Sequence, residues 1–149
     1  MKQTKLNTII RDIESKEFAS VRGTNVHLCL SKIAFCNGGF IGDPDIISKI
    51  KNNAELCEIM GPLSRAEVPL AGYVRGTFLS RRIDRLYVNK NTKTVIVLDY
   101  KTDKDKNLYH EKYRVQLNEY RELLKQIYPE FNIVCKILWL NDFTLENVI

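Results

Sequence analysis

Residues 83–101 read IDRLYVNKNTKTVIVLDYK, and this stretch decides the fold. The run at 93–101 is rich in β-branched residues and is the clearest strand in the chain. Residues 74–88 predict the strand before it, and the polar segment 89–92 predicts a turn between the two. The stretch is therefore expected to form a β-hairpin.

The hairpin is expected to bring two acidic residues together. A tight turn centred between Asn91 and Thr92 places Asp84 directly opposite Asp99 on the neighbouring strand. Opposed Cβ atoms in a sheet lie ~5 Å apart. Two carboxylates at that distance repel each other, and burial raises the cost, so a compensating cation is expected beside them.

The second strand also predicts where this pair points. Side chains alternate along a strand, so Asp99 and Lys101 share a face with Val95 and Val97, and the two valines predict that this face is buried. Lys101 is one candidate for the compensating cation, and Mg²⁺ or Mn²⁺ is the better one. The alternative is a pair of aspartates that is solvated or salt-bridged at the surface.

These residue types predict metal-assisted hydrolysis of a phosphodiester. The metal would polarise the ester and lower the pKa of a bound water. Lys101 would orient that water or neutralise developing negative charge. The chain has only two histidines, His27 and His110, and no Ser-His-Asp pattern, so covalent catalysis is not expected.

Two helices are predicted ahead of the strands, after a helical lead-in at residues 1–20. Thr24 is expected to cap the first helix, and residues 37–39 to end it. Pro44 predicts the start of the second helix, and 61–62 its end. Their apolar stripes are Val26, Leu30, Ile33 and Ala34 in the first helix and Ile46, Ile47, Ile50 and Leu56 in the second.

The remaining elements set the fold class. Residues 65–71 predict a strand before the hairpin, 108–127 an amphipathic helix after it, and 132–140 a buried final strand. This order predicts an α/β (α+β) fold, with a central mixed β-sheet flanked by helices. We expect a single domain over 1–149. The apolar face of the long helix is Tyr113, Leu117, Tyr120, Leu124 and Ile127.

The charge of the chain favours an anionic partner. The 149 residues carry 23 Lys and Arg against 18 Asp and Glu, a net charge of +5. Residues 81–114 alone hold ten basic and five acidic side chains, so the basic excess is concentrated around Asp84, Asp99 and Lys101. The alternative is a solvated face of mixed charge.

The cysteines do not predict a metal site. Cys29, Cys36, Cys57 and Cys135 show no Cys-x-x-Cys spacing and are expected to be core thiols. Neither a signal peptide nor an apolar run long enough to cross a membrane is evident in the sequence. A cytoplasmic protein with reduced thiols, and no membrane partner, is expected.

Five ordered motifs resemble a known family. IDRLYV, VIVLDYKT and QLNEY, in that order, resemble the PD-(D/E)XK nuclease superfamily. More narrowly, the chain is similar to the RecB-like nuclease domain at the C-terminal end of AddA-type helicase-nucleases. RGTNVHLCL resembles the family's helical motif with a histidine, and AEVPL its glutamate motif. The resemblance covers residues 23–140 and implies a restriction-endonuclease-like core.

The resemblance implies roles for the central residues. His27, Asp84 and Asp99 would be metal ligands, together with the backbone carbonyl of Tyr100. Lys101 would be the catalytic lysine. The implied metal is Mg²⁺, with Mn²⁺ as an alternative. Read alone, His27 is more simply a half-buried histidine, and only the motif set makes it a ligand.

Further roles follow at the edge of this site. Glu67 would be catalytic by supporting the metal or its surroundings, although an ordinary charge on an edge strand is the alternative. The family usually has glycine where this chain has Arg82. Relatives that bind an iron–sulfur cluster carry three cysteines after the nuclease motifs. This chain has only Cys135 there, so the resemblance implies no cluster. The residues expected to contact DNA are Gln116, Tyr120, Arg82, Arg85 and Thr102.

The implied function is a Mg²⁺-dependent DNA nuclease, an exonuclease acting on DNA ends or single strands in double-strand-break repair and recombination. The chain has no nucleotide-binding P-loop motif, so either a separately encoded helicase is the expected partner, or the domain is a standalone or relict fragment. Three alternatives stay open. They are a catalytically silent module that binds DNA or a partner, another superfamily nuclease such as a CRISPR-associated exonuclease, junction resolvase or restriction enzyme, and a structural α/β protein.

Overall fold

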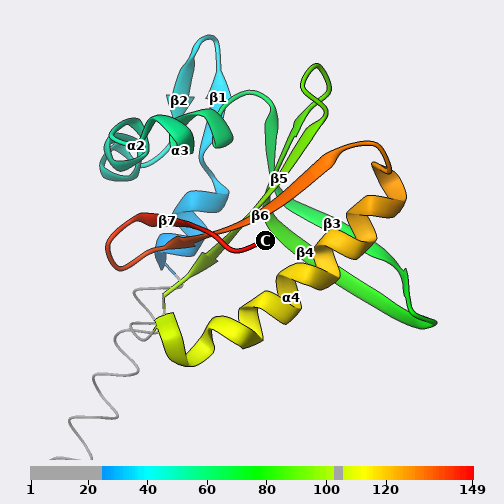
Figure 1. Cartoon of the computed structure of the whole chain (residues 1–149). Coiled ribbons are helices and arrows are strands. Elements are labelled where there is room, and N and C mark those ends of the chain that lie inside the picture. Colours follow the sequence, from blue (N-terminus) through cyan, green and yellow to red (C-terminus); the bar gives the residue numbers. More distant parts are fainter. Residues whose placement is uncertain (1–24, 103–105) are drawn as a thin grey trace, which may run out of the picture.

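The computed structural model describes residues 25–102 and 106–149. Its centre is a five-stranded mixed sheet, in the order β3-β4-β5-β6-β7 (Figure 1). Every neighbouring pair is antiparallel except β5 and β6, which are parallel because α4 carries the chain across between them. The bounds are Ser64–Val74 for β3, Thr77–Asn89 for β4, Thr94–Lys101 for β5, Lys106–Ile127 for α4, Asn132–Trp139 for β6 and Thr144–Asn147 for β7.

The predicted register of the central hairpin is confirmed. β4 and β5 pair from Asn89 with Thr94 to Arg85 with Leu98, the register that a turn centred on Asn91 and Thr92 requires. The turn is held by the Asn89 side chain, which accepts backbone hydrogen bonds from Asn91 and Thr92. The mixed α/β fold, with helices flanking one sheet, is also as predicted.

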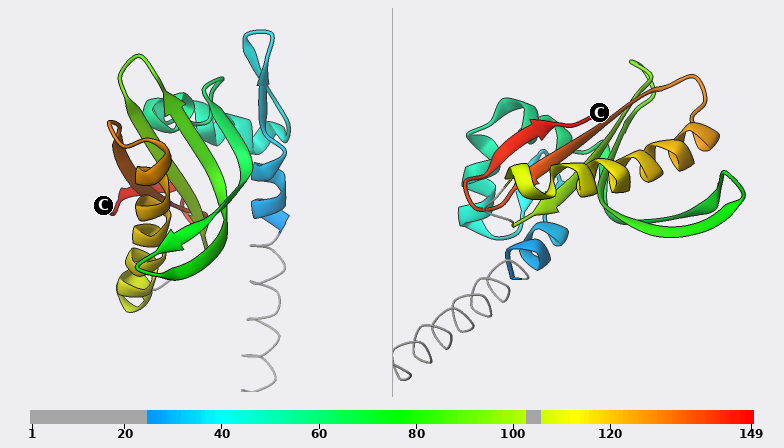
Figure 2. Two further views of the ribbon diagram at one scale, coloured as in Figure 1. Left: turned by 90° about the vertical axis from the view of Figure 1, so that its right-hand side faces the viewer. Right: turned by 60° about the horizontal axis from the view of Figure 1, so that its bottom comes forward.

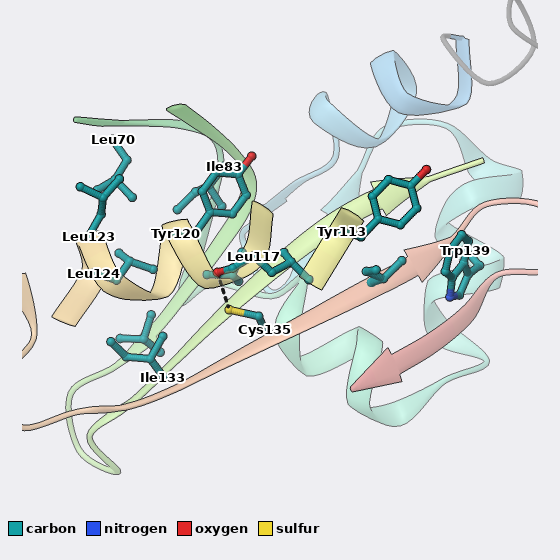
Figure 3. Close-up of a cluster of buried hydrophobic side chains, with 13 residues drawn as sticks. Leu70, Ile83, Tyr113, Leu117, Tyr120, Leu123, Leu124, Ile133, Cys135 and Trp139 are labelled. Carbon is teal, nitrogen blue, oxygen red and sulfur yellow. Dashed lines mark hydrogen bonds between the residues drawn. The ribbon is translucent and has the colours of Figure 1, made fainter. Parts of the chain in front are cut away.

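Helix α4 covers one face of the sheet. The predicted apolar stripe packs there, with Tyr113, Leu117, Tyr120 and Leu124 buried against strand residues (Figure 3). Ile127 is the exception, because it lies in the last turn of the helix and remains 56% exposed. Val95 and Val97 are fully buried on this face, as the alternation along β5 predicts.

The opposite face packs against the N-terminal part of the described chain (Figure 2). Residues 25–31 form a helix, and β1, β2, α2 and α3 follow. Leu98 and Tyr100 of β5 are buried on this side, alternating with the residues that face α4. The bounds are Ala34–Cys36 for β1, Gly39–Ile41 for β2, Pro44–Lys51 for α2 and Ala54–Ile59 for α3.

The predicted extent of the first helix is wrong. It stops at residue 31, and Ile33 and Ala34 lie outside it, because residues 34–41 form the β1–β2 hairpin instead. Asn37 and Gly38 have φ angles of 51° and 80°, the two positive values that a type I′ hairpin turn needs. The Asn-Gly pair is a hairpin signal that was available in the sequence. The lead-in at 1–20 and the cap at Thr24 lie outside the described residues.

The predicted second helix is two helices. Asn52 ends α2, and the Asn53 side chain caps α3 by accepting a hydrogen bond from the backbone of Leu56. Asparagine competes with helical hydrogen bonding through its own side chain, which explains the break. The start of α2 is as predicted, since Asp43 caps it ahead of Pro44.

The remaining differences lie at turns and ends. The β3–β4 turn falls at Arg75 and Gly76, later than predicted, and both residues have positive φ. Strand β6 is not the final strand, because β7 follows it. Cys36 is exposed rather than a core thiol, whereas Cys135 is buried and burial raises the pKa of its thiol to about 12. Along 25–102 and 106–149, none of the helices combines the length and apolar character needed to cross a membrane.

Candidate metal centre

The site lies where the β4–β5 ladder ends. After Arg85 pairs with Leu98, the two strands separate, so Asp84 and Asp99 are not paired in the sheet as the extended register predicts. The Asp84 side chain takes the place of the missing strand bond, and its Oδ2 accepts a 2.8 Å hydrogen bond from the backbone N–H of Tyr100. A carboxylate is thereby fixed at the mouth of the opening.

His27 reaches this carboxylate from the helix at residues 25–31. Its Nε2 lies 3.1 Å from Asp84 Oδ1, and its ring meets the Tyr100 ring edge-on at a centroid distance of 5.2 Å. The hydrogen bond with Asp84 raises the pKa of His27, and burial opposes that shift. His27 and Asp84, which are 57 residues apart in the sequence, are therefore in direct contact.

Glu67 completes a three-residue group. One ligand atom from each of His27, Glu67 and Asp84 lies within 4.8 Å of the other two. Two carboxylates and an imidazole are a donor set that Mn²⁺ accepts readily and that supplies oxygens to Mg²⁺. These residues fit the predicted divalent ion. Asp99 is not a member of this group, so among the described residues Glu67, rather than Asp99, joins His27 and Asp84.

The backbone at Glu67 explains why its side chain turns toward this group. Its φ is 54°, in the left-handed region that an unbranched side chain enters only at a cost. The faces of β4 reverse at the same place, because Ile83 packs against α4 whereas Arg85 lies on the other face of the sheet. Residues two apart in a regular strand share a face, so the reversal falls at Asp84 and its neighbour Glu67.

Asp99 and Lys101 form a second, more deeply buried pair. Asp99 is 3% exposed, and its Oδ2 lies 2.8 Å from Lys101 Nζ, although the two groups are not aligned as a hydrogen bond. Burial raises the pKa of Asp99 to about 6, Lys101 opposes this, and the nearby Asp84 carboxylate adds to it. The repulsion between the two aspartates that the sequence predicted is therefore present.

Lys101 is held by residues of α4. Its Nζ donates to Gln116 Oε1 at 3.1 Å and lies 4.6 Å from the centre of the Tyr113 ring. Gln116 in turn donates to the Tyr120 hydroxyl at 2.9 Å, and burial raises the pKa of Tyr120 to about 12. Of the two predicted DNA contacts, Gln116 therefore holds the lysine directly, and Tyr120 holds Gln116. Tyr113, which the sequence predicts only as a core residue, also contacts the ammonium group of Lys101.

Arg85 has a structural role that differs from the predicted DNA contact. Only 2% of it is exposed, and its guanidinium donates to the carbonyls of Leu30 and Ile33, to Ser64 and to the Tyr100 hydroxyl. The two carbonyls lie at and just beyond the C-terminal end of the helix at 25–31, which favours a cation. Arg85 therefore anchors the helix that carries His27.

The other predicted residues lie at the rim. The Arg82 side chain is 69% exposed, with Nη1 3.8 Å from Glu67 Oε2, and Thr102 is exposed just after β5. The N–H and C=O of one strand residue point toward the same neighbouring strand, so the carbonyl of Tyr100 faces the opening beside Asp84. Whether this carbonyl is a ligand stays a prediction.

Comparison of the sequence with protein-family models and with curated proteins found no match.

Proposed function

We propose that this protein is a Mg²⁺- or Mn²⁺-dependent DNA nuclease of the PD-(D/E)XK superfamily, with a restriction-endonuclease-like core. One observation carries the proposal. Residues from separate motifs, selected on sequence alone, lie together at one opening of the sheet: His27, Glu67 and Asp84 within 4.8 Å of one another, and the Asp99–Lys101 pair beside Asp84. A coincidental Asp-x-Lys pattern would not gather these motifs.

We assign each residue a role according to its position. His27, Glu67 and Asp84 hold the metal, with Asp99 next to them. The bound ion supplies Lewis acidity toward a phosphodiester and lowers the pKa of a water. Lys101 faces the same opening and offsets negative charge that develops on the phosphate. Gln116 fixes the direction of that ammonium group through its 3.1 Å hydrogen bond.

The charge distribution supports a polyanionic substrate. The surroundings of the site carry exposed basic side chains, among them Arg82 at the rim. Contacts of this kind recognise the phosphate backbone and give little sequence specificity. We propose that DNA ends or single strands are the substrate and that a helicase partner supplies them.

The testing experiment is a nuclease assay on labelled single- and double-stranded DNA with Mg²⁺, Mn²⁺ or EDTA. The variants are Lys101→Ala and Asp99→Ala at the site and Lys90→Ala in the exposed β4–β5 turn as a matched control. The proposal expects metal-dependent cleavage that both site variants abolish and the control retains.

Two outcomes would argue against catalysis by the chain alone. DNA binding without cleavage, together with a metal-dependent rise in Tm, would favour a domain that needs its helicase partner for cleavage. Neither cleavage nor any response to metal would contradict the nuclease proposal and favour a structural protein.

A further inference from the structure

The β3–β4 hairpin carries an exposed aromatic pair at its tip. Tyr73 and Phe78 are register partners, their ring centroids lie 5.4 Å apart, and they are 66% and 58% exposed. Large aromatic side chains are expensive to leave in water, and adjacent exposed rings mark interaction surfaces more often than isolated ones. The fold of the domain does not use this pair.

The pair belongs to an exposed strip that runs back to the candidate metal centre. On the hairpin, Leu70 and Ile83 face α4, so the alternate positions face away from it. Three alternate residue pairs of the β3–β4 register make up this outer face, and all their members are exposed. The strip consists of Pro69 with Arg82, Ala71 with Ser80, and Tyr73 with Phe78.

The strip joins the site at Arg82. That side chain lies 3.8 Å from Glu67, which belongs to the group formed with His27 and Asp84. From Glu67 to Tyr73 the strand advances six residues, or about 20 Å at ~3.3 Å each. This length corresponds to about six stacked nucleotides at ~3.4 Å each.

The hairpin is held firmly from the α4 side. A Cβ at Gly72 would meet Leu123 Cδ2 at 3.0 Å, and Gln126 donates a 2.8 Å hydrogen bond to the carbonyl of Tyr73. Arg81 is tied to Glu119 of α4 with a 2.9 Å ion pair. The outer strip is therefore presented on a rigid support, which lowers the entropic cost of binding.

The charge on the hairpin selects the kind of partner. Residues 68–83 contain three arginines, Arg75, Arg81 and Arg82, and neither Asp nor Glu. Arg75 is exposed at the turn, next to the aromatic pair. Flat aromatic faces combined with nearby cations, in a segment without carboxylates, suit unpaired bases and their phosphates.

We propose that the strip binds a single DNA strand, with bases stacked on Tyr73 and Phe78 and phosphates at Arg75 and Arg82. The strand then runs along the small side chains of Ala71 and Ser80 toward the metal centre. This deepens the proposed function by assigning a binding surface for the single-stranded part of the substrate, but the binding itself needs no cleavage.

The test measures binding of fluorescent oligo(dT) of about 12 nucleotides in EDTA, by anisotropy, so that catalysis plays no part. The double variant Tyr73→Leu/Phe78→Leu keeps the apolar area and removes the ring faces. The double variant Tyr73→Trp/Phe78→Trp keeps the faces. Stacking predicts at least about tenfold weaker binding for the leucine variant, near wild-type affinity for the tryptophan variant, and no change in either for a blunt duplex of equal length.

Three outcomes would overturn the proposal. One is equal affinity of wild type and leucine variant for oligo(dT). Another is absence of single-strand binding by the wild type. The third is wild-type self-association, measured by sedimentation, that Tyr73→Ser/Phe78→Ser abolishes while oligo(dT) binding persists, which would make the strip a protein interface. A wild type that binds and loses binding in the leucine variant, yet never cleaves DNA, would overturn the nuclease proposal alone.

Discussion

The two halves of β4 differ in what their polar side chains do. From Arg85 to Asn89 the strand is paired with β5, and as far as Tyr87 also with β3. The charged group in this paired half, Arg85, is buried with protein partners for its donors. From Thr77 to Ile83 the strand is paired with β3 alone, and Asp84 has no register partner on either side. Arg82 and Asp84 keep part of their side-chain surface exposed. Adjacent residues thus serve the fold and the site because the ladder ends between them.

The largest effect is expected in the half of β4 that is not paired with β5, residues 77–84. Asp84→Asn keeps the shape of the side chain and removes the charge that pairs with His27 and would bind the proposed metal ion. We expect cleavage to fall at least about 10²–10³-fold. We also expect the stabilisation by Mn²⁺, about 2.7 kcal/mol at 100 times Kd, to disappear from thermal denaturation.

The matched control is Asp45→Asn, the same chemical change at an exposed position in α2. It is expected to leave both the rate and the metal response unchanged. An Asp84→Asn protein that is stabilised by Mn²⁺ as strongly as wild type would show that Asp84 is not a ligand.

Substitution in the half of β4 that is paired with β5, residues 85–89, should lower the stability of the protein. Arg85→Met removes hydrogen bonds to Leu30 and Ile33 and leaves their carbonyls buried without this donor. We expect the free energy of unfolding, measured in urea, to fall by about 2–4 kcal/mol. Arg65→Met, at an exposed position on β3, is expected to change it by less than about 0.5 kcal/mol. Equal losses in the two variants would remove the distinction between the halves.

Asp99, on the strand opposite the opening, should show a conflict between stability and function. Burial raises its pKa from 3.8 to about 6, so the folded state binds this proton more tightly than the unfolded state. The contribution of the group to stability therefore falls as the pH rises from about 4 to about 6.

Asp99→Asn removes that cost. In EDTA at pH 7 we expect the variant to be about 1–2 kcal/mol more stable than wild type, a gain that vanishes below about pH 4. The raised pKa already includes the opposing attraction of Lys101, whose Nζ lies 2.8 Å from Asp99 Oδ2. The same variant is expected to lose cleavage. A destabilised variant at pH 7 would mean that the ion pair outweighs burial.

The smallest effect is expected at the β4–β5 turn, at the end of the hairpin away from Asp84. Lys93 and Glu130 form a 3.3 Å ion pair in which both side chains are largely exposed. Lys93→Met is expected to lower the free energy of unfolding by less than about 0.5 kcal/mol, with a smaller loss in high salt. A change above about 1 kcal/mol would show that this end depends on charge as the opening does.

Local patterns in the sequence were sufficient to predict strands β3 to β6 and the pairing of β4 with β5, but not β7 at the edge of the sheet. The β-branched run before Asp99 and the polar turn at 89–92 specify β4, β5 and their register, since side-chain alternation leaves one arrangement that buries Val95 and Val97. The Asn37–Gly38 pair carried a hairpin signal of the same local kind. Strand alternation and register selected Asp84, Asp99 and Lys101 for the site, and the motif resemblance added His27 and Glu67.

The tertiary structure alone decided how those residues are used. Whether Asp84 meets Asp99 in the ladder or binds the Tyr100 N–H depends on where two strands separate, and twist and packing set that point. The burial of Arg85 depends on a helix end more than 50 residues away in the sequence. The sequence by itself determined strands β3 to β6, the register of β4 with β5 and the chemistry of the side chains, because these depend on neighbouring residues. The membership of the metal group and the separation of structural from site residues required the folded chain, because they depend on contacts between distant segments.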